Sequence, residues 1–194
     1  MRVLLIFCHP VEDSYNAALH GVARTALWRA GHAVDDCDLY AEGFNPVLSR
    51  QERLDYHDTA INRQSAGPYV ERLLAAEALV LCFPVWNFGL PALLKGFFDR
   101  VFLPGVSFHL TENGRIEPRL QHVRKLAAIA TYGASRPVAW YMGDPPRRFL
   151  MRALRPLIRP GSRVVYLAQY RMNVLTEAAR TRFLVKVERE MARF

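Results

Sequence analysis

The chain has 194 residues, of which 51% are hydrophobic, and a formal net charge of +8. This size and hydrophobic content predict one compact domain, residues 1–194, whose core needs neither disulfide bonds nor a structural metal. The basic excess fits a nucleic acid, an anionic surface or an anionic small molecule, so its distribution along the chain matters more than its total.

Signals for export or membrane insertion are not expected in this chain. The three cysteines, Cys8, Cys37 and Cys82, form no CxxC pair and lie in apolar segments, as reduced and buried thiols do. The apolar stretch at the N-terminus is shorter than that of a signal peptide. Charges or prolines interrupt every apolar run before the roughly 18 residues of a membrane-spanning helix. We therefore expect a cytoplasmic protein without stable membrane insertion.

The first third of the chain alternates strand and helix patterns. Arg2–Cys8 is short and rich in Val, Leu and Ile, which predicts a buried strand. Apolar positions at helical spacing predict a helix over Ser14–Ala30, with its first residue or the preceding aspartate as N-cap and Gly31 at its end. Ala33–Leu39 predicts a second strand. Residues 40–67 have no clear period, which is typical of a long functional loop.

The remaining two thirds continue this alternation. In chain order, we expect a helix over 69–77, a strand over 78–83 that is buried on both faces, a helix over 92–102, an irregular or hairpin excursion over 105–118, a strand over 125–130, a helix over 147–158, a strand over 163–169 and a last helix capped by Thr176. Five strands alternating with helices predict an α/β fold, a doubly wound five-stranded parallel sheet with helices on both faces.

Three predicted loops follow the carboxyl ends of strands, which is where doubly wound sheets bind ligands. Loop one spans residues 8–16, loop two spans 84–90 and loop three spans 131–135. We expect these three loops to lie at one edge of the sheet and to carry the chemistry of the protein.

Loop one, CHPVEDSYN, runs into the start of a helix, where unpaired backbone N–H groups favour an anion such as a phosphate. It contains no glycine, so it is neither a dinucleotide-binding fingerprint nor a Walker loop. The side chains of His9, Ser14 and Asn16 are expected to donate instead. A capped helix after a structural His-Pro turn is the alternative interpretation.

Loop two, PVWNFGL, places two aromatic residues in a turn bracketed by prolines. Trp86 and Phe88 would suit the flat walls that a planar ligand needs. Gly89 is expected either to take a left-handed conformation or to allow a close approach of the chain. The alternative is that both aromatic side chains cover the end of the core.

Loop three, TYGAS, is small apart from Tyr132 and leaves its strand through Gly133. This composition favours consecutive exposed N–H groups that stabilise an anion, although an ordinary tight turn is equally compatible. Together, the three loops predict a site for a phosphorylated, planar heterocycle such as a flavin. The six histidines show no metal-ligand spacing and the chain has no GxSxG motif, so neither a metal centre nor a serine hydrolase is expected.

Much of the basic excess lies near the C-terminal third of the chain. Arg148, Arg152, Arg155 and Arg159 follow one another at steps of four, three and four residues, along one face of the predicted helix. This pattern fits a solvated face, and it also fits a surface for an anion or a partner. Because no nucleic-acid-binding motif accompanies the charge, nucleic acid is not expected as a partner.

Four segments of the chain resemble the flavodoxin-like NAD(P)H:quinone oxidoreductases, a family that includes modulator-of-drug-activity proteins and, more distantly, FMN azoreductases. The segments are HPVEDSYNAAL, DLYAEGFNPVLSRQE, FPVWNFGLPALLKGFFDRVF and TYGAS, in which Ala134 replaces one glycine of the family's loop. The resemblance implies a homodimer that uses NAD(P)H as electron donor and a quinone as acceptor. It favours FAD as the cofactor, with FMN as the alternative.

By position, the resemblance assigns the flavin contacts to the three loops. The implied cofactor residues are His9, Ser14, Tyr15, Asn16 and Ala17 at the phosphates, Pro84, Val85, Trp86, Asn87 and Phe88 at the isoalloxazine ring, and Thr131, Tyr132, Gly133 and Ala134 at its N1 and O2 edge.

Three further positions are implied at the substrate side. Phe108 falls where the family places an aromatic residue that reaches the partner's site, and Trp140 or Tyr141 falls near a tyrosine that some members pair with a histidine in a relay. The equivalent stretch here, ASRPVAWYMGDP, contains no histidine, so Tyr141 is the candidate catalytic residue without that partner. The implied reaction is a two-step hydride transfer from NAD(P)H through flavin N5 to a quinone. The alternatives are a regulatory flavoprotein subunit of a potassium-efflux system and an FMN-dependent azo- or nitroreductase.

Overall fold

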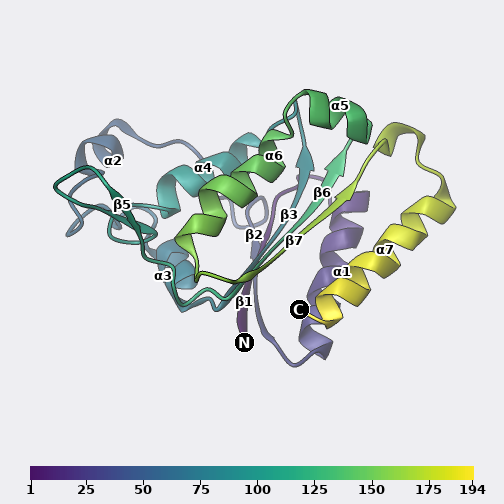
Figure 1. Cartoon of the computed structure of the whole chain (residues 1–194), viewed down its shortest axis with the longest axis horizontal. Coiled ribbons are helices and arrows are strands. Elements are labelled where there is room, and N and C mark those ends of the chain that lie inside the picture. The colour runs from purple at the N-terminus through teal and green to yellow at the C-terminus, as the bar shows by residue number, and fades with distance from the viewer.

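The computed structural model describes residues 1–194 and is built on a five-stranded sheet in the order β2-β1-β3-β6-β7 (Figure 1). The strands are β1 (Arg2–Phe7), β2 (Ala33–Asp38), β3 (Ala78–Val85), β6 (Lys125–Tyr132) and β7 (Arg163–Gln169). Every neighbouring pair is parallel. The predicted α/β doubly wound sheet is thus confirmed. Its winding reverses between β1 and β3, because β2 lies on one side of β1 and the later strands lie on the other.

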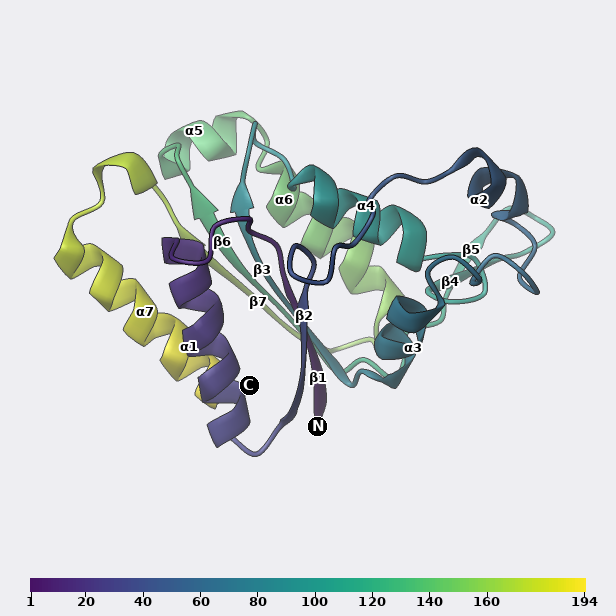
Figure 2. The ribbon, with the colours of Figure 1, turned by 180° about the vertical axis from the view of Figure 1, so that it is seen from behind.

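Helices cover both faces of the sheet (Figures 1 and 2). Helices α1 (Tyr15–Arg29) and α7 (Glu177–Ala192) lie side by side on one face, while α3 (Gly67–Ala75) and α4 (Ala92–Val101) cover the other. Alternate residues of each central strand therefore point into two separate cores. One core has 17 buried residues and lies beneath α1 and α7, and the other has 30 buried residues and lies beneath α3 and α4. Burial on both faces explains the unbroken apolar character of β1 and β3.

Two strands are longer than the sequence predicted. β3 continues through Pro84 and Val85, and β6 continues through Thr131 and Tyr132, because these residues pair with one another as Pro84 with Thr131 and Val85 with Tyr132. The first two residues of the segments predicted as loops two and three are therefore paired strand residues, and the two loops leave the sheet side by side at residues 86 and 133.

The connection over 40–67 contains a helix that the sequence analysis missed. Helix α2 (Arg50–Asp55) has six residues, none of them buried, so it carries no hydrophobic period. Its start is fixed by a capping box between Ser49 and Glu52. The connection packs closely on α4: a Cβ atom at Gly96 would lie 2.3 Å from the carbonyl oxygen of Pro46, so only glycine allows this approach.

The excursion over 105–118 contains the expected hairpin. Strands β4 (Phe108–Leu110) and β5 (Ile116–Pro118) pair in antiparallel fashion, and Gly114 between them has a φ of +73°. Thr176 caps α7 as predicted, since its hydroxyl accepts a hydrogen bond from the N–H of Ala179.

The single helix predicted over 147–158 was wrong in its bounds and its type. The segment consists of α6 (Pro145–Arg148), a π-helical turn η1 (Phe149–Leu154) and a 3-10 turn η2 (Arg155–Leu157). Pro156 has no N–H group to donate within a regular helix, which accounts for the change of helix type. Helix α5 (Arg136–Tyr141) and the turn η3 (Met172–Val174) were not predicted. No helix in the chain is both long enough and apolar enough to cross a membrane.

Candidate functional site

The three loops meet at the carboxyl edge of the sheet, beside the point where the winding reverses (Figure 1). A buried hydrogen bond joins two of them: Asn16 Nδ2 donates to Thr131 Oγ1 at 2.8 Å. Both residues are more than nine-tenths buried. The side chains of Asn16 and Thr131 therefore link loop one to loop three rather than facing a ligand.

Loop one leaves backbone donors free at the start of α1. The hydroxyl of Ser14 accepts a hydrogen bond from the N–H of Ala17, and the hydroxyl of Tyr15 donates to the carbonyl oxygen of Arg180 at 2.9 Å. His9 Nδ1 accepts from the N–H of Val11 at 3.0 Å. The N–H groups of Tyr15 and Asn16 have no acceptor within the chain. At the positive end of a 15-residue helix dipole, these N–H groups are suited to an anion.

Loop two is held by a strained turn. The N–H of Gly89 donates to the carbonyl oxygen of Trp86 at 2.8 Å, and both intervening residues are left-handed, with φ of +47° at Asn87 and +59° at Phe88. Two positive φ values in succession are those of a type I′ turn, which a phenylalanine adopts only at a cost. The prediction for Gly89 was wrong, because its φ is not positive and an added Cβ would make only ordinary contacts. Trp86 is 42% exposed and does not join the core.

Loop three is anchored by a buried tyrosine. The side chain of Tyr132 is almost inaccessible, and its hydroxyl donates to Asp144 Oδ1 at 2.6 Å and contacts the hydroxyl of Tyr166. Its ring centroid lies 4.7 Å from that of Tyr170. Burial, together with the neighbouring Tyr166 and Asp144, raises the pKa of Tyr132 above its ordinary value, so the phenol stays protonated and keeps donating.

A cavity of about 200 Å³ lies between loops two and three. Its lining residues are Val85, Asn87, Phe88, Tyr132, Gly133 and Ala134. Within the chain, no acceptor pairs with the N–H groups of Asn87, Phe88, Gly133 and Ala134. Four unused donors around one small cavity suit a flat ring with acceptor atoms along its edge.

The three residues predicted at the substrate side lie outside this cavity. Trp140 and Tyr141 lie on α5 and are 79% and 82% exposed. Phe108 lies on the β4/β5 hairpin, at the end of the molecule that carries α2, whereas loops two and three lie at the end that carries α5 (Figures 1 and 2).

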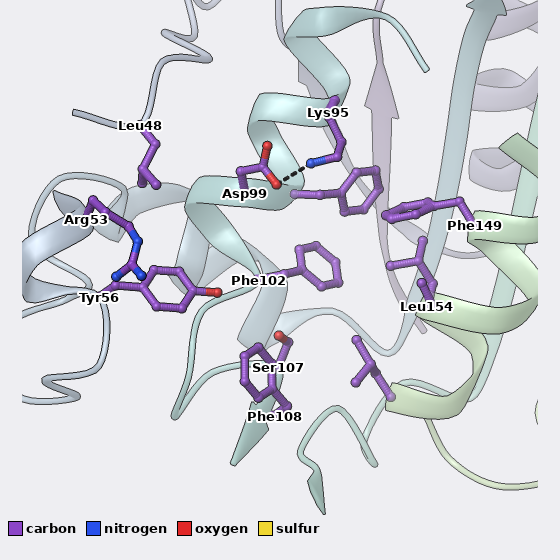
Figure 3. Close-up of a pocket in the computed structure, with 13 residues that line it drawn as sticks. Leu48, Arg53, Tyr56, Lys95, Asp99, Phe102, Ser107, Phe108, Phe149 and Leu154 are labelled. Carbon is purple, nitrogen blue, oxygen red and sulfur yellow. Dashed lines mark hydrogen bonds and ion pairs between the residues drawn. The ribbon is translucent and has the colours of Figure 1, made fainter. Parts of the chain in front are cut away.

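Phe108 lines a larger cavity of about 400 Å³ between α4 and the η1–η2 segment (Figure 3). Phe98, Phe102 and Leu154 form much of its apolar wall. The hydroxyl of Ser107 is buried there without a hydrogen-bond partner. Lys95 and Asp99 form an ion pair at its edge, as the dashed line in Figure 3 shows.

The residues that support loop three were not predicted from the sequence. Asp144 and Tyr166 are the hydrogen-bond partners of Tyr132, yet they come from the α5–α6 turn and from β7. Asp144 is left-handed, with a φ of +44°, and follows Gly143, so a Gly-Asp turn was the one available signal. Nothing in the local pattern of β7 distinguishes Tyr166 from an ordinary partly buried strand residue.

Comparison with known proteins gives a consistent family. The model of the flavodoxin-like fold family matches residues 1–157. NAD(P)H dehydrogenase [quinone] 1 of Rattus norvegicus is 32% identical over 149 residues, 69% of this chain and 54% of that protein. An FMN-dependent NADH:quinone oxidoreductase of Lachnoclostridium phytofermentans is 29% identical over 144 residues, 66% of this chain and 71% of that protein.

A solved structure shares the fold over the whole chain. A crystal structure of a protein from Streptococcus mutans UA159 covers 100% of both chains with a TM-score of 0.85 and 26% sequence identity. The chain spans about half the length of the first curated relatives that it matches.

Proposed function

The chain belongs to the flavodoxin-like fold family, and from that premise we propose that it is a flavin-dependent NAD(P)H:quinone oxidoreductase. The observation that carries the proposal is the cavity between loops two and three, with its four unpaired N–H donors. An isoalloxazine ring is flat and carries nitrogen and oxygen acceptors along one edge, so the unpaired donors around the cavity are suited to hydrogen-bond it.

The residues of the three loops would divide the binding of the flavin between them. The N–H groups of Tyr15 and Asn16, at the start of α1, would hold the phosphate. Trp86, exposed beside the cavity, would cover part of the ring. The N–H groups of Gly133 and Ala134 would stabilise negative charge on the pyrimidine edge, because they are already fixed in place by the anchored Tyr132. A bound flavin would supply the hydride and electron chemistry between NAD(P)H and a quinone.

FAD is proposed ahead of FMN because loop two and the helix after it resemble the corresponding segment of the quinone reductases. The relative from Lachnoclostridium phytofermentans is named as FMN-dependent, so the mass of the chromophore released from the purified protein decides between the two. A cytoplasmic location is proposed because all three cysteines are free and buried.

A homodimer is proposed from the position of Phe108. If this residue contributes to a quinone site, it does so in another copy of the chain, because it lies at the α2 end and its own loops two and three lie at the α5 end (Figures 1 and 2). Substitution Phe108→Ala should then change the KM for the quinone without changing the affinity for the flavin. A monomer in light scattering at working concentration would overturn this proposal.

Tyr141 is proposed as the catalytic residue on the resemblance and on its exposed position in α5. The test is Tyr141→Phe, which removes only the hydroxyl. A fall in kcat with an unchanged affinity for the flavin would support a role for that hydroxyl, whereas an unchanged kcat would exclude it.

The direct test of the function is turnover. Purified protein loaded with FAD or FMN is assayed for oxidation of NADH and NADPH with a series of benzo- and naphthoquinones. The proposal predicts flavin-dependent turnover with parallel lines in double-reciprocal plots, since the two substrates react in turn. Flavin-loaded protein that oxidises neither donor with any quinone would overturn the proposal. Activity confined to azo or nitro compounds would mean that these compounds, and not quinones, are the electron acceptors.

A further inference from the structure

A cavity of about 210 Å³, here called the second cavity, is lined in part by a residue that hydrogen-bonds to the wall of the cavity between loops two and three, here called the first cavity. The lining residues of the second cavity are Trp140, Gly143, Asp144, Arg147, Arg148, Met151 and Arg152. One hydrogen-bonded pair of side chains connects the walls of the two cavities, because Tyr132 lines the first and donates to Asp144, which lines the second.

The second cavity carries unbalanced positive charge. Arg147, Arg148 and Arg152 are all exposed, and none of them pairs with a carboxylate in the structure. Asp144 is the one acidic lining residue, and its carboxylate already accepts from Tyr132. Three guanidinium groups around one carboxylate leave the cavity positive, which favours a phosphate.

Local backbone geometry positions one of these arginines. Gly143 has a φ of +82°, and a Cβ atom there would lie 3.1 Å from Arg148 Nη1. The missing side chain leaves room for the Arg148 guanidinium to lie over the turn at the cavity wall. Because arginine binds phosphates through a planar fork of donors, a guanidinium held in this way is suited to a bidentate contact.

The cavity also has an aromatic wall. Trp140 is 79% exposed, the second highest value among the large hydrophobic residues of the chain, and it lies beside the arginines. An exposed indole next to guanidinium groups fits a ligand that joins a flat heterocycle to a phosphate, such as a phosphorylated adenosine.

We propose that this cavity binds the 2′-phosphorylated adenosine end of NADPH, so that the chain prefers NADPH to NADH. The inference rests on the proposed function, because it takes the ligand to be the electron donor of that reaction. The arginines hold the 2′-phosphate, Trp140 stacks on the adenine, and the nicotinamide end extends past the Tyr132–Asp144 pair towards the first cavity. NADH lacks the 2′-phosphate and leaves the arginines unpaired.

Binding of a fragment tests the cavity without any turnover. Calorimetry of the full chain compares 2′,5′-ADP with 5′-AMP, which lacks the 2′-phosphate, and with inorganic pyrophosphate. We expect 2′,5′-ADP to bind at least about tenfold more tightly than 5′-AMP, which lacks the charged hydrogen bonds to the 2′-phosphate. The same difference is expected against pyrophosphate, which lacks the adenine that stacks on Trp140. Equal affinity for 2′,5′-ADP and 5′-AMP, or pyrophosphate binding as tightly as 2′,5′-ADP, would overturn the proposal.

Paired variants locate the effect. The double substitution Arg148→Gln and Arg152→Gln should remove the preference for 2′,5′-ADP. The control, Arg155→Gln with Arg159→Gln, removes the same charge from exposed arginines of the same segment that do not line the cavity, and should keep the preference. If both double variants lose affinity equally, general attraction by positive charge explains the binding and the site is withdrawn.

Kinetics then separate this inference from the function on which it rests. In the Arg148→Gln, Arg152→Gln variant, kcat/KM should fall about tenfold or more for NADPH and less than twofold for NADH. An equal fall for both donors would overturn the NADPH preference while leaving the reductase intact. A protein with no turnover for either donor would refute the proposed function, and fragment binding would still report on the cavity.

Discussion

Loops two and three follow neighbouring strands that pair up to Val85 and Tyr132, yet they present their N–H groups by opposite means. Loop two keeps Trp86 exposed and shapes its backbone with two left-handed residues. Loop three has no residue with a positive φ. Its conformation is fixed by the buried side chain of Tyr132, whose hydroxyl contacts Asp144 and Tyr166. Substitution of the exposed side chain of loop two should therefore act mainly on the ligand. Substitutions that disturb its left-handed backbone, or that remove the anchor of loop three, should act mainly on the stability of the fold.

The largest expected effect comes from removing the anchor. Tyr132→Phe leaves the carboxylate of Asp144 and the hydroxyl of Tyr166 without their buried partner and should lower the free energy of unfolding by about 2 kcal/mol. Urea denaturation followed by circular dichroism measures the change. Tyr141→Phe is the matched control, because this exposed hydroxyl makes no hydrogen bond and its loss should change stability by less than about 0.5 kcal/mol. An equal effect of both substitutions would contradict the anchor.

A somewhat smaller effect is expected from the backbone of loop two. Asn87→Val places a β-branched residue at a φ of +47° and should cost about 1–2 kcal/mol of stability. Asn87→Gly places a residue without a Cβ atom at the same φ and should leave the free energy of unfolding nearly unchanged. Denaturation curves of the two variants measure the difference between them. Equal stability of the valine and glycine variants would mean that the turn relaxes and that its left-handed geometry is not required.

Alkaline pH offers a graded test of the anchor. The pKa of Tyr132 is raised above the unfolded value of about 10, so its stabilising contribution is complete below pH 10 and is lost as the pH rises above it. Above pH 10 this residue alone should make stability fall by about 1.4 kcal/mol per pH unit. In the Tyr132→Phe variant, the free energy of unfolding should fall less steeply with pH, by that amount per pH unit. Identical slopes for wild type and variant between pH 10 and 11.5 would contradict the anchor role of Tyr132.

The smallest effect on stability is expected at the exposed aromatic of loop two. Trp86→Leu should change the free energy of unfolding by less than about 0.5 kcal/mol, because the side chain is outside the core. Its affinity for flavin should fall about tenfold, the loss expected when an aromatic stacking surface is removed. Flavin fluorescence quenching measures the second quantity. A variant that loses stability but keeps its affinity would reverse the contrast between the two loops.

The main elements of the fold could be predicted because each of them carries a local signal. The apolar runs of the central strands and the caps at Ser14 and Thr176 depend on neighbouring residues only. Helix α2 gave no hydrophobic period because none of its residues is buried, although the Ser49 and Glu52 pair was a readable capping signal.

The placement of the three loops at one edge also followed from the sequence, but the roles of their side chains did not. Tyr132 was expected to face a ligand, and what turns it inward is contact with Asp144 and Tyr166, which are 12 and 34 residues further along the chain. Likewise, the left-handed residues of loop two are Asn87 and Phe88 rather than Gly89, because the turn closes between Trp86 and Gly89. Long-range contacts and turn register of this kind have no local signature.

The most direct test of the central claim, that this sheet edge binds a flavin, is the absorbance spectrum of the purified protein before and after anaerobic addition of NADPH. The account predicts flavin absorbance bands, a released chromophore with the mass of FAD or FMN, and bleaching of the bands on addition of the donor. A colourless protein that takes up neither flavin would contradict it. Loop two would then be a turn that serves another ligand or none.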